Sequence, residues 1–149
     1  MRRIAVLAAA LAVLGPACKK KQQIPVDVSE AKDIPREIAL QKLQELLPTA
    51  ATVSSTVPKE SYKASEVKDW RVGDLGLEIV PQNAKDKTLS LAYQDMTEVR
   101  LDQSGRTFLA RVFSVHQADK GKEHLAFSWS AQEAPRQVVE LLEAVRQKR

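Results

Sequence analysis

Cysteine is nearly missing from this chain of 149 residues, glycine is scarce, and long apolar runs do not occur. The single cysteine, Cys18, excludes a disulfide within the chain. The five glycines form no glycine-rich phosphate loop, so the usual nucleotide-binding motif is excluded. The longest apolar run, residues 4–14, would make only about 16 Å of helix, roughly half of a 30 Å hydrocarbon core. A membrane-spanning helix is therefore excluded as well.

The residues that usually perform chemistry are also sparse. The two histidines, His116 and His124, flank a predicted turn at 117–122. A metal site usually needs three or four ligands, so we expect exposed hairpin histidines and no metal. No Gly-x-Ser-x-Gly elbow and no plausible Ser–His–Asp set is present, and the neighbouring acids Asp95 and Glu98 are expected to be solvated. We predict that the protein is not an enzyme and carries no cofactor.

The N-terminus is the most informative part of the chain. Arg2 and Arg3 precede the apolar run, and a small-residue segment, Gly15-Pro16-Ala17, follows it. A positive start, an apolar stretch and a small-residue cleavage site are typical of a secretory signal peptide, here residues 1–17. The alternative is a cytosolic protein with a buried N-terminal helix. Such a helix normally has a polar face, and this run has none.

The position of Cys18, directly after the leader, resembles the lipobox of bacterial lipoproteins. In that family the cysteine receives a diacylglycerol thioether before cleavage. The resemblance covers residues 1–18, and it departs from the family where Gly15 replaces the usual Leu and where Pro16 stands. It implies a lipid anchor on Cys18. Gly15 and Ala17 would also suit an ordinary signal peptidase, which leaves a soluble periplasmic protein as the alternative.

The charge of the chain favours a membrane surface over nucleic acid. Lys19, Lys20 and Lys21 would lie at the level of the lipid headgroups, where each contributes about 1 kcal/mol against anionic lipid. Without Arg2 and Arg3, 21 basic and 19 acidic residues remain, interspersed along the chain. We therefore expect no nucleic-acid partner. In the sorting rule of bacterial lipoproteins, Asp after the cysteine retains the protein in the inner membrane. Because Lys19 stands at that place, the resemblance implies the outer membrane, with the domain facing the periplasm.

Removal of the leader leaves 132 residues, enough for one domain with its own core. Residues 18–33 are polar, contain proline and show no periodicity, so we expect a lipid-anchored flexible tether. Residues 34–149 then form a single globular domain. Apolar residues at helical spacing predict a helix over 35–47, which ends at Pro48.

After this helix, short runs rich in β-branched and aromatic residues alternate with turn residues, which is typical of antiparallel strands. The predicted strands cover 53–57, 67–72, 75–79, 89–93, 97–101, 108–115 and 125–129. An amphipathic helix follows, with a buried stripe of Val138, Leu141, Leu142 and Val145. Ser130 and Glu133 fit a capping box, which would start the helix directly after Ser130. Pro135 fits better with a start at Ala134, and both starting positions remain open.

This order predicts an α+β fold with an N-terminal helix, a strongly bent antiparallel sheet or barrel of about seven strands, and a C-terminal amphipathic helix. The segments LSLAYQDMTEVRL (89–101) and LAFSWSAQEAPRQVVELLEAVR (125–146) resemble the strand pairs and closing helix of bacterial pleckstrin-homology-like (PH-like) domains. The resemblance implies a PH-like domain. A curved sheet with one packed helix in another topology is the alternative.

A PH-like domain without catalytic residues suggests a protein-interaction scaffold in the envelope. A strand edge, or the groove between sheet and helix, would accept a peptide by β-augmentation. The stretch that corresponds to the phosphoinositide loop of PH domains has Lys59 and Lys63 offset by Glu60, so that ligand is not implied. Tyr62 and Trp70 are candidate exposed aromatics, although core packing is favoured for Trp70.

Two other classes of function stay open. A carrier or sensor of a small apolar ligand or lipid would need a pocket inside the curved sheet, lined by Leu91, Phe108, Phe127 and Trp129. A hydrolase, the weakest alternative, would need His, Asp and Ser side chains that converge in a cleft. A filled core with an exposed strand edge would favour the scaffold.

The anchor prediction is tested by Cys18→Ser. We expect this variant to leave the membrane fraction, or to remain unprocessed, because no other residue can take the lipid thioether. The thermal transition of the folded domain should stay unchanged. Fractionation of the variant together with the wild type would contradict the anchor.

Overall fold

A computed structural model describes residues 21–148. The predicted signal peptide and Cys18 lie outside the described residues. The helices are α2 (Arg36–Leu46) and α3 (Glu133–Gln147), with short 3-10 turns η1 (Ala31–Asp33), η2 (Leu47–Thr49), η3 (Ala64–Glu66), η4 (Tyr93–Asp95) and η5 (Val115–Lys120). The strands are β1 (Gln22–Ile24), β2 (Thr52–Thr56), β3 (Lys59–Lys63), β4 (Val67–Val72), β5 (Gly76–Pro81), β6 (Leu89–Ala92), β7 (Met96–Ser104), β8 (Thr107–Ser114) and β9 (Leu125–Trp129). Within residues 21–148, no helix combines the length and the apolar character needed to cross a bilayer.

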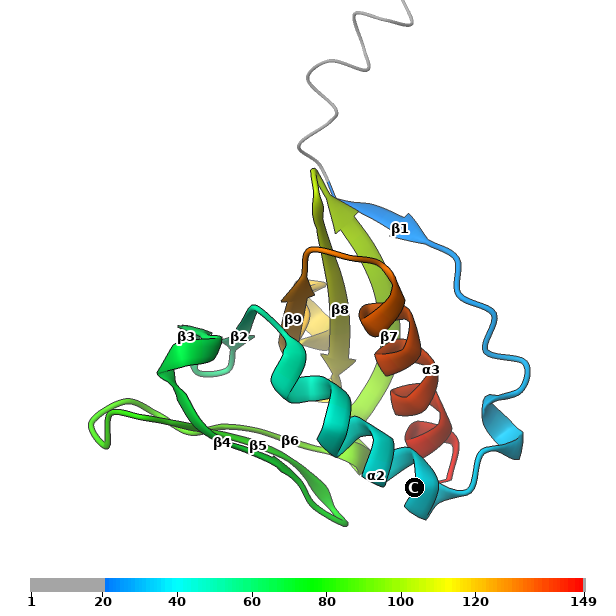
Figure 1. Ribbon diagram of the computed structural model, residues 1–149, viewed down its shortest axis with the longest axis horizontal. Coiled ribbons are helices and arrows are strands. Elements are labelled where there is room, and N and C mark those ends of the chain that lie inside the picture. The colour runs from blue at the N-terminus through cyan, green and yellow to red at the C-terminus, as the bar shows by residue number, and fades with distance from the viewer. Residues whose placement is uncertain (1–20, 149) are drawn as a thin grey trace, which may run out of the picture.

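The strands form two antiparallel sheets (Figure 1). The larger has six strands in the order β1-β7-β8-β9-β2-β3, and the smaller has three in the order β4-β5-β6. The α+β class is confirmed, but the single bent sheet or closed barrel is wrong. The reason lies at η3 and η4, the short turns that carry the chain from one sheet to the other and interrupt the ladder.

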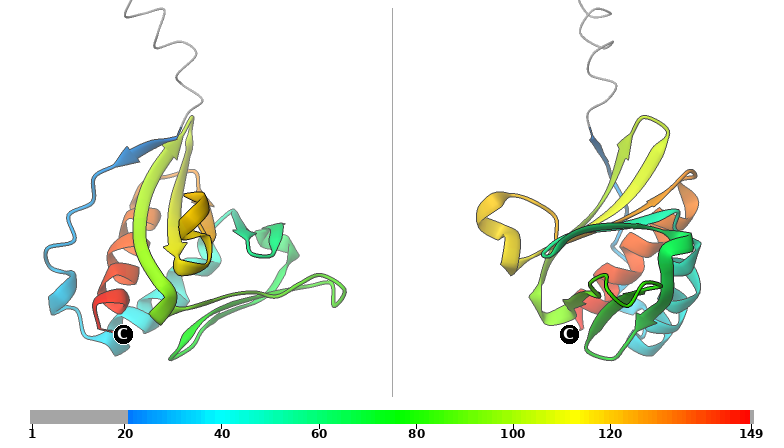
Figure 2. Two further views of the ribbon diagram at one scale, coloured as in Figure 1. Left: turned by 180° about the vertical axis from the view of Figure 1, so that it is seen from behind. Right: turned by 90° about the vertical axis from the view of Figure 1, so that its left-hand side faces the viewer.

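The core fills the angle between the sheets and the two helices. Figures 1 and 2 show α2 and α3 together on one face of the six-stranded sheet, with η5 on the other face. The predicted stripe of α3 is confirmed: Val138, Leu142 and Val145 are fully buried and Leu141 is 4% exposed. The capping box is wrong, since α3 begins at Glu133, which places Pro135 in its first turn.

Helix α2 lies within the predicted range 35–47 and buries Ala39 and Leu43. Two strands were not predicted. Strand β3 has exposed lysines and only one buried side chain, Tyr62, so its alternation is weak. Strand β1 lies in the polar stretch expected to be a flexible tether. This stretch instead rests partly on the domain, because β1 pairs with β7 and Ala31 of η1 is completely buried.

The packing of α3 is tested by Leu142→Ala. Because Leu142 is fully buried, we expect a loss of about 2–5 kcal/mol in the free energy of unfolding, measured by urea denaturation. The matched control, Arg136→Ala, changes an exposed position of the same helix and should stay within about 0.5 kcal/mol of the wild type. Equal losses for the two variants would contradict this role of α3.

Candidate functional site

Among the described residues, strand β1 covers only part of the β7 edge of the larger sheet. Strand β1 pairs with the end of β7 through Gln22↔Gln103 and Ile24↔Leu101. It ends just before Pro25, and the chain then leaves the sheet edge. The β7 residues before Leu101 have no neighbouring strand on that side among residues 21–148.

The free part of this edge presents backbone groups ready for pairing. The carbonyl of Val112 in β8 accepts the amide N–H of His124 at 2.7 Å, so the backbone of Val112 faces β9. Val99 is the β7 partner of Val112. In an antiparallel pair, the backbone N–H and C=O groups of two paired residues either point toward each other or point away from each other. Because those of Val112 point away from β7, the N–H and C=O of Val99 point away from β8, toward the open edge. Neither group has a backbone hydrogen-bond partner within the described part of the chain.

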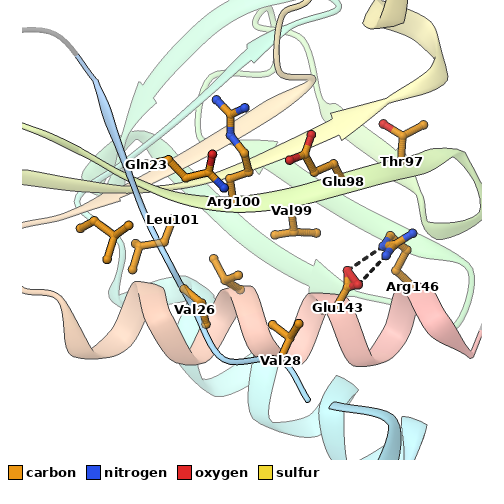
Figure 3. Close-up of a pocket in the computed structure, with 12 residues that line it drawn as sticks. Gln23, Val26, Val28, Thr97, Glu98, Val99, Arg100, Leu101, Glu143 and Arg146 are labelled. Carbon is orange, nitrogen blue, oxygen red and sulfur yellow. Dashed lines mark hydrogen bonds and ion pairs between the residues drawn. The ribbon is translucent and has the colours of Figure 1, made fainter. Parts of the chain in front are cut away.

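A groove of about 160 Å³ runs along this edge, between β7, α3 and the segment that follows β1 (Figure 3). Val99 and Leu101 point from β7 toward α3, while Glu98 and Arg100 point to the other side of the strand. The apolar lining comprises Ile24, Val26, Val28, Val99, Leu101 and Val139. On α3 the groove ends at an ion pair, in which Arg146 donates to Glu143 at 2.6 Å.

A charged cluster lies beside the edge on the face of β7 and β8 that points away from α3. Arg111 donates to Asp102 and, at 2.8 Å, to Glu123, while Arg100 lies 3.4 Å from Asp102. The two guanidinium groups lie about 5 Å from the centre of the Phe113 ring. Burial disfavours the charge of Arg111, but the two carboxylates hold its pKa above the ordinary value.

Asp102 is nearly inaccessible, with 1% of its side chain exposed. Its Oδ2 accepts from both arginines, but its Oδ1 has no hydrogen-bond partner within residues 21–148. A buried carboxylate oxygen without a donor is costly, so this position favours an additional donor. Its neighbour across the ladder is Gln23 of β1.

The other exposed edges are closed by side chains. The backbone of β4 faces outward at Trp70 and Val72, and the amide of Gln44 in α2 meets both: it donates to the Trp70 carbonyl at 2.6 Å and accepts from the Val72 N–H at 3.1 Å. The β3 edge carries exposed Lys59 and Lys63. Such devices keep a sheet from pairing with other chains. The β7 edge at Val99 lacks one within the described residues.

His124 closes the edge of β6. Its Nε2 lies 3.0 Å from the carbonyl of Ser90, and its Nδ1 lies 2.7 Å from the hydroxyl of Ser114. Because Nε2 must donate to the carbonyl, Nδ1 accepts from Ser114. The expectation of two exposed histidines is wrong for His124, which is 4% exposed, whereas His116 lies outside and pairs with Asp95 at 2.9 Å.

These residues do not assemble a hydrolytic site. Ser114 bonds to His124, but the carboxylate of Asp95 is bonded to His116, and Ser114 is 1% exposed. A serine nucleophile must be within reach of the substrate carbonyl, and this hydroxyl is buried. The contacts instead join β6 to the end of β8 and the start of β9, which links the two sheets.

The aromatic residues fill the interior. Trp70 is 9% exposed, as favoured from the sequence, but the expectation of an exposed Tyr62 is wrong: it is 4% exposed and donates to the carbonyl of Lys87 at 2.6 Å. The rings of Trp70, Phe127 and Trp129 follow one another at centroid distances of 6.4 Å. Side chains therefore occupy the place where the carrier hypothesis needs a hollow.

Comparison with protein-family models, with curated proteins and with solved structures gave no match. The candidate site is therefore defined by its geometry alone. The alternation of Val99 and Leu101 in the sequence predicts a strand with an apolar face. The docking place expected from the sequence is a strand edge or the groove between sheet and helix, with no particular strand specified. Which edge stays open depends on where β1 leaves the ladder, and the weak pattern of β1 gives no signal for that.

The role of His124 predicts how stability depends on pH. Burial, as the largest cause, lowers the pKa of His124 in the folded protein below the ordinary 6.5. As the pH falls below about 6.5, the unfolded chain therefore binds a proton before the folded one, and the free energy of unfolding decreases. Urea denaturation at pH 7.5 and pH 5 should show this decrease.

His124→Gln is the informative variant, because glutamine does not titrate. Its free energy of unfolding should depend less on pH than that of the wild type. His116→Gln, which changes the exposed neighbour, serves as the control and should keep the decrease. An unchanged pH dependence in His124→Gln would contradict the assignment.

Proposed function

We propose that this chain is a non-enzymatic lipoprotein of the bacterial cell envelope, whose domain holds an extended segment of a partner protein at the open edge of β7. The observation that carries the proposal is the backbone of Val99, which faces outward beside an apolar groove. An added strand would satisfy these groups with main-chain hydrogen bonds, and its side chains would alternate between the groove and the face of the sheet that carries the charged cluster. This is the protein-interaction scaffold that the sequence suggested.

The contrast between the edges supports this proposal. Gln44 and His124 form hydrogen bonds with outward-facing carbonyls of β4 and β6, and β3 carries exposed lysines that disfavour pairing with another strand. An unprotected sheet edge is a site for aggregation unless it has a binding partner. Protection of the other three edges therefore favours a specific partner for the edge of β7. The alternative, a carrier of a small apolar ligand, has less support, because Phe127 is fully buried and Trp129 is 6% exposed within a filled core.

The anchor would set the distance of the site from the bilayer. Three residues lie between Cys18 and Gln22, so their Cα atoms, four steps apart along the chain, are separated by at most roughly 14 Å. Since Gln22 pairs with Gln103 near the end of β7, a lipid on Cys18 would hold the candidate site close to the membrane surface. We favour the outer membrane, with the domain in the periplasm. The domain would be PH-like, as the resemblance of segments 89–101 and 125–146 implies, and α2 and β1 would be additions to it.

Site-specific photo-crosslinking in intact cells tests the proposal. A photoreactive phenylalanine at the exposed position Thr97 should give a discrete adduct with an envelope protein. Val99→Pro should reduce the yield about tenfold, because proline removes the N–H that faces the open edge. The ladder to β8 keeps its bonds, so the thermal transition should show a folded domain.

The same label at Lys63, on the exposed edge of β3, is the matched control and should give no adduct that depends on Val99. The proposal fails if Thr97 and Lys63 capture the same proteins, or if Val99→Pro leaves the Thr97 adduct unchanged.

A further inference from the structure

Strand β1 has the features of a strand that can be replaced. It contributes three residues, of which Gln22 and Gln23 are exposed and Ile24 is half-buried. Its ladder runs through the backbone of Leu101 and Gln103, the next outward-facing residues of β7 after Val99. One continuous edge, from Val99 to Gln103, is therefore partly covered by a short, weakly buried strand.

The chain after β1 is held independently of that strand. Ala31 in η1 is fully buried, and the ammonium group of Lys148 donates to the carbonyls of Ala31 and Ile34. Val26 and Val28 pack against the core. Release of β1 would withdraw Ile24, which also packs against the core, and would stop near Pro25.

The charges along the edge describe the strand that would fit it. Asp102 is buried, and its Oδ1 lacks a donor among the described residues, while the facing position is occupied by uncharged Gln23. Arg100 and Glu98 lie on the same face of β7 as Asp102, the face that points away from α3. Residues directly opposite in an antiparallel pair lie about 5 Å apart and favour opposite charges.

We propose that β1 is a displaceable strand and that a partner strand takes its place, antiparallel to β7 from Gln103 to Glu98. The partner carries a basic residue opposite Asp102, an acidic residue opposite Arg100, and apolar residues opposite Leu101 and Val99. The basic side chain supplies the donor that Asp102 lacks. This inference rests on the proposed function, since it names the kind of segment that the β7 edge binds.

The test uses the full chain in detergent and a labelled peptide, Thr-Arg-Val-Glu-Val-Lys, whose order places each charge as described. Fluorescence anisotropy measures its Kd. The double variant Gln22→Pro with Ile24→Pro removes the two N–H groups of β1 that face β7. Binding should tighten about tenfold, because the peptide no longer competes with β1. Gln23→Pro, whose N–H faces away from β7, is the matched control and should have a smaller effect.

Two further readouts do not depend on variants. Peptides with Arg, Gln or Glu opposite Asp102 should bind the wild type in that order of affinity. Hydrogen exchange should show that peptide binding exposes the amides of Gln22 and Ile24 while that of Ile34 stays protected.

Unchanged or weaker binding after the release of β1, or an affinity order that does not follow the charge opposite Asp102, overturns the inference. Edge-to-edge dimers of the double variant that exclude the peptide would overturn it too. If the crosslink from Thr97 is still lost in Val99→Pro in any of these cases, the docking of a partner at the β7 edge stands, and only the displacement of β1 is overturned. If that crosslink also fails, both fall.

Discussion

The packing of α3 into the angle between the two sheets is the interaction on which the rest of this structure depends. Within residues 21–148 neither sheet closes on itself, so the inner face of each must be covered by another element. α3 contacts β7, β8 and β9, and it packs beside α2, which in turn contacts β4. Burial of Val138, Leu142 and Val145 thus joins elements that no ladder connects.

An open arrangement of this kind leaves sheet edges, and the treatment of each edge is what distinguishes the candidate site. Side-chain groups take the place of a neighbouring strand at β4 and β6, where Gln44 and His124 meet outward-facing carbonyls. On β7 the cover is a short strand, β1, and beyond it the backbone of Val99 is unpaired within the described residues. The same edge lies beside a groove and a buried carboxylate, Asp102, with an unsatisfied oxygen. Geometry and charge therefore point to one place on the surface.

Prediction from the sequence succeeded where burial leaves a periodic trace. The strand at 89–93, the strand at 125–129 and the stripe of α3 were found because apolar residues recur at a spacing of two in strands and of three and four in a helix. Prediction failed for β3, because its side chains are mostly exposed. It also failed for Tyr62, because an aromatic residue flanked by lysines is expected to lie on the surface. The burial of His124 was not predicted, because its hydrogen-bond partners Ser90 and Ser114 are distant in the sequence. No local pattern around His124 indicates these hydrogen bonds.

The sequence by itself determined the class of fold, the position of most strands and both long helices, since these follow from local periodicity and from proline and glycine at turns. It also predicts the export signal and the lipid anchor, through the order of residues 1–18. Only the tertiary structure decided that the strands divide into two sheets, that His124 is buried and that no strand of residues 21–148 covers the β7 edge at Val99. These features depend on which distant backbone groups meet, and pairing between distant strands leaves no periodic mark on the residues that take part.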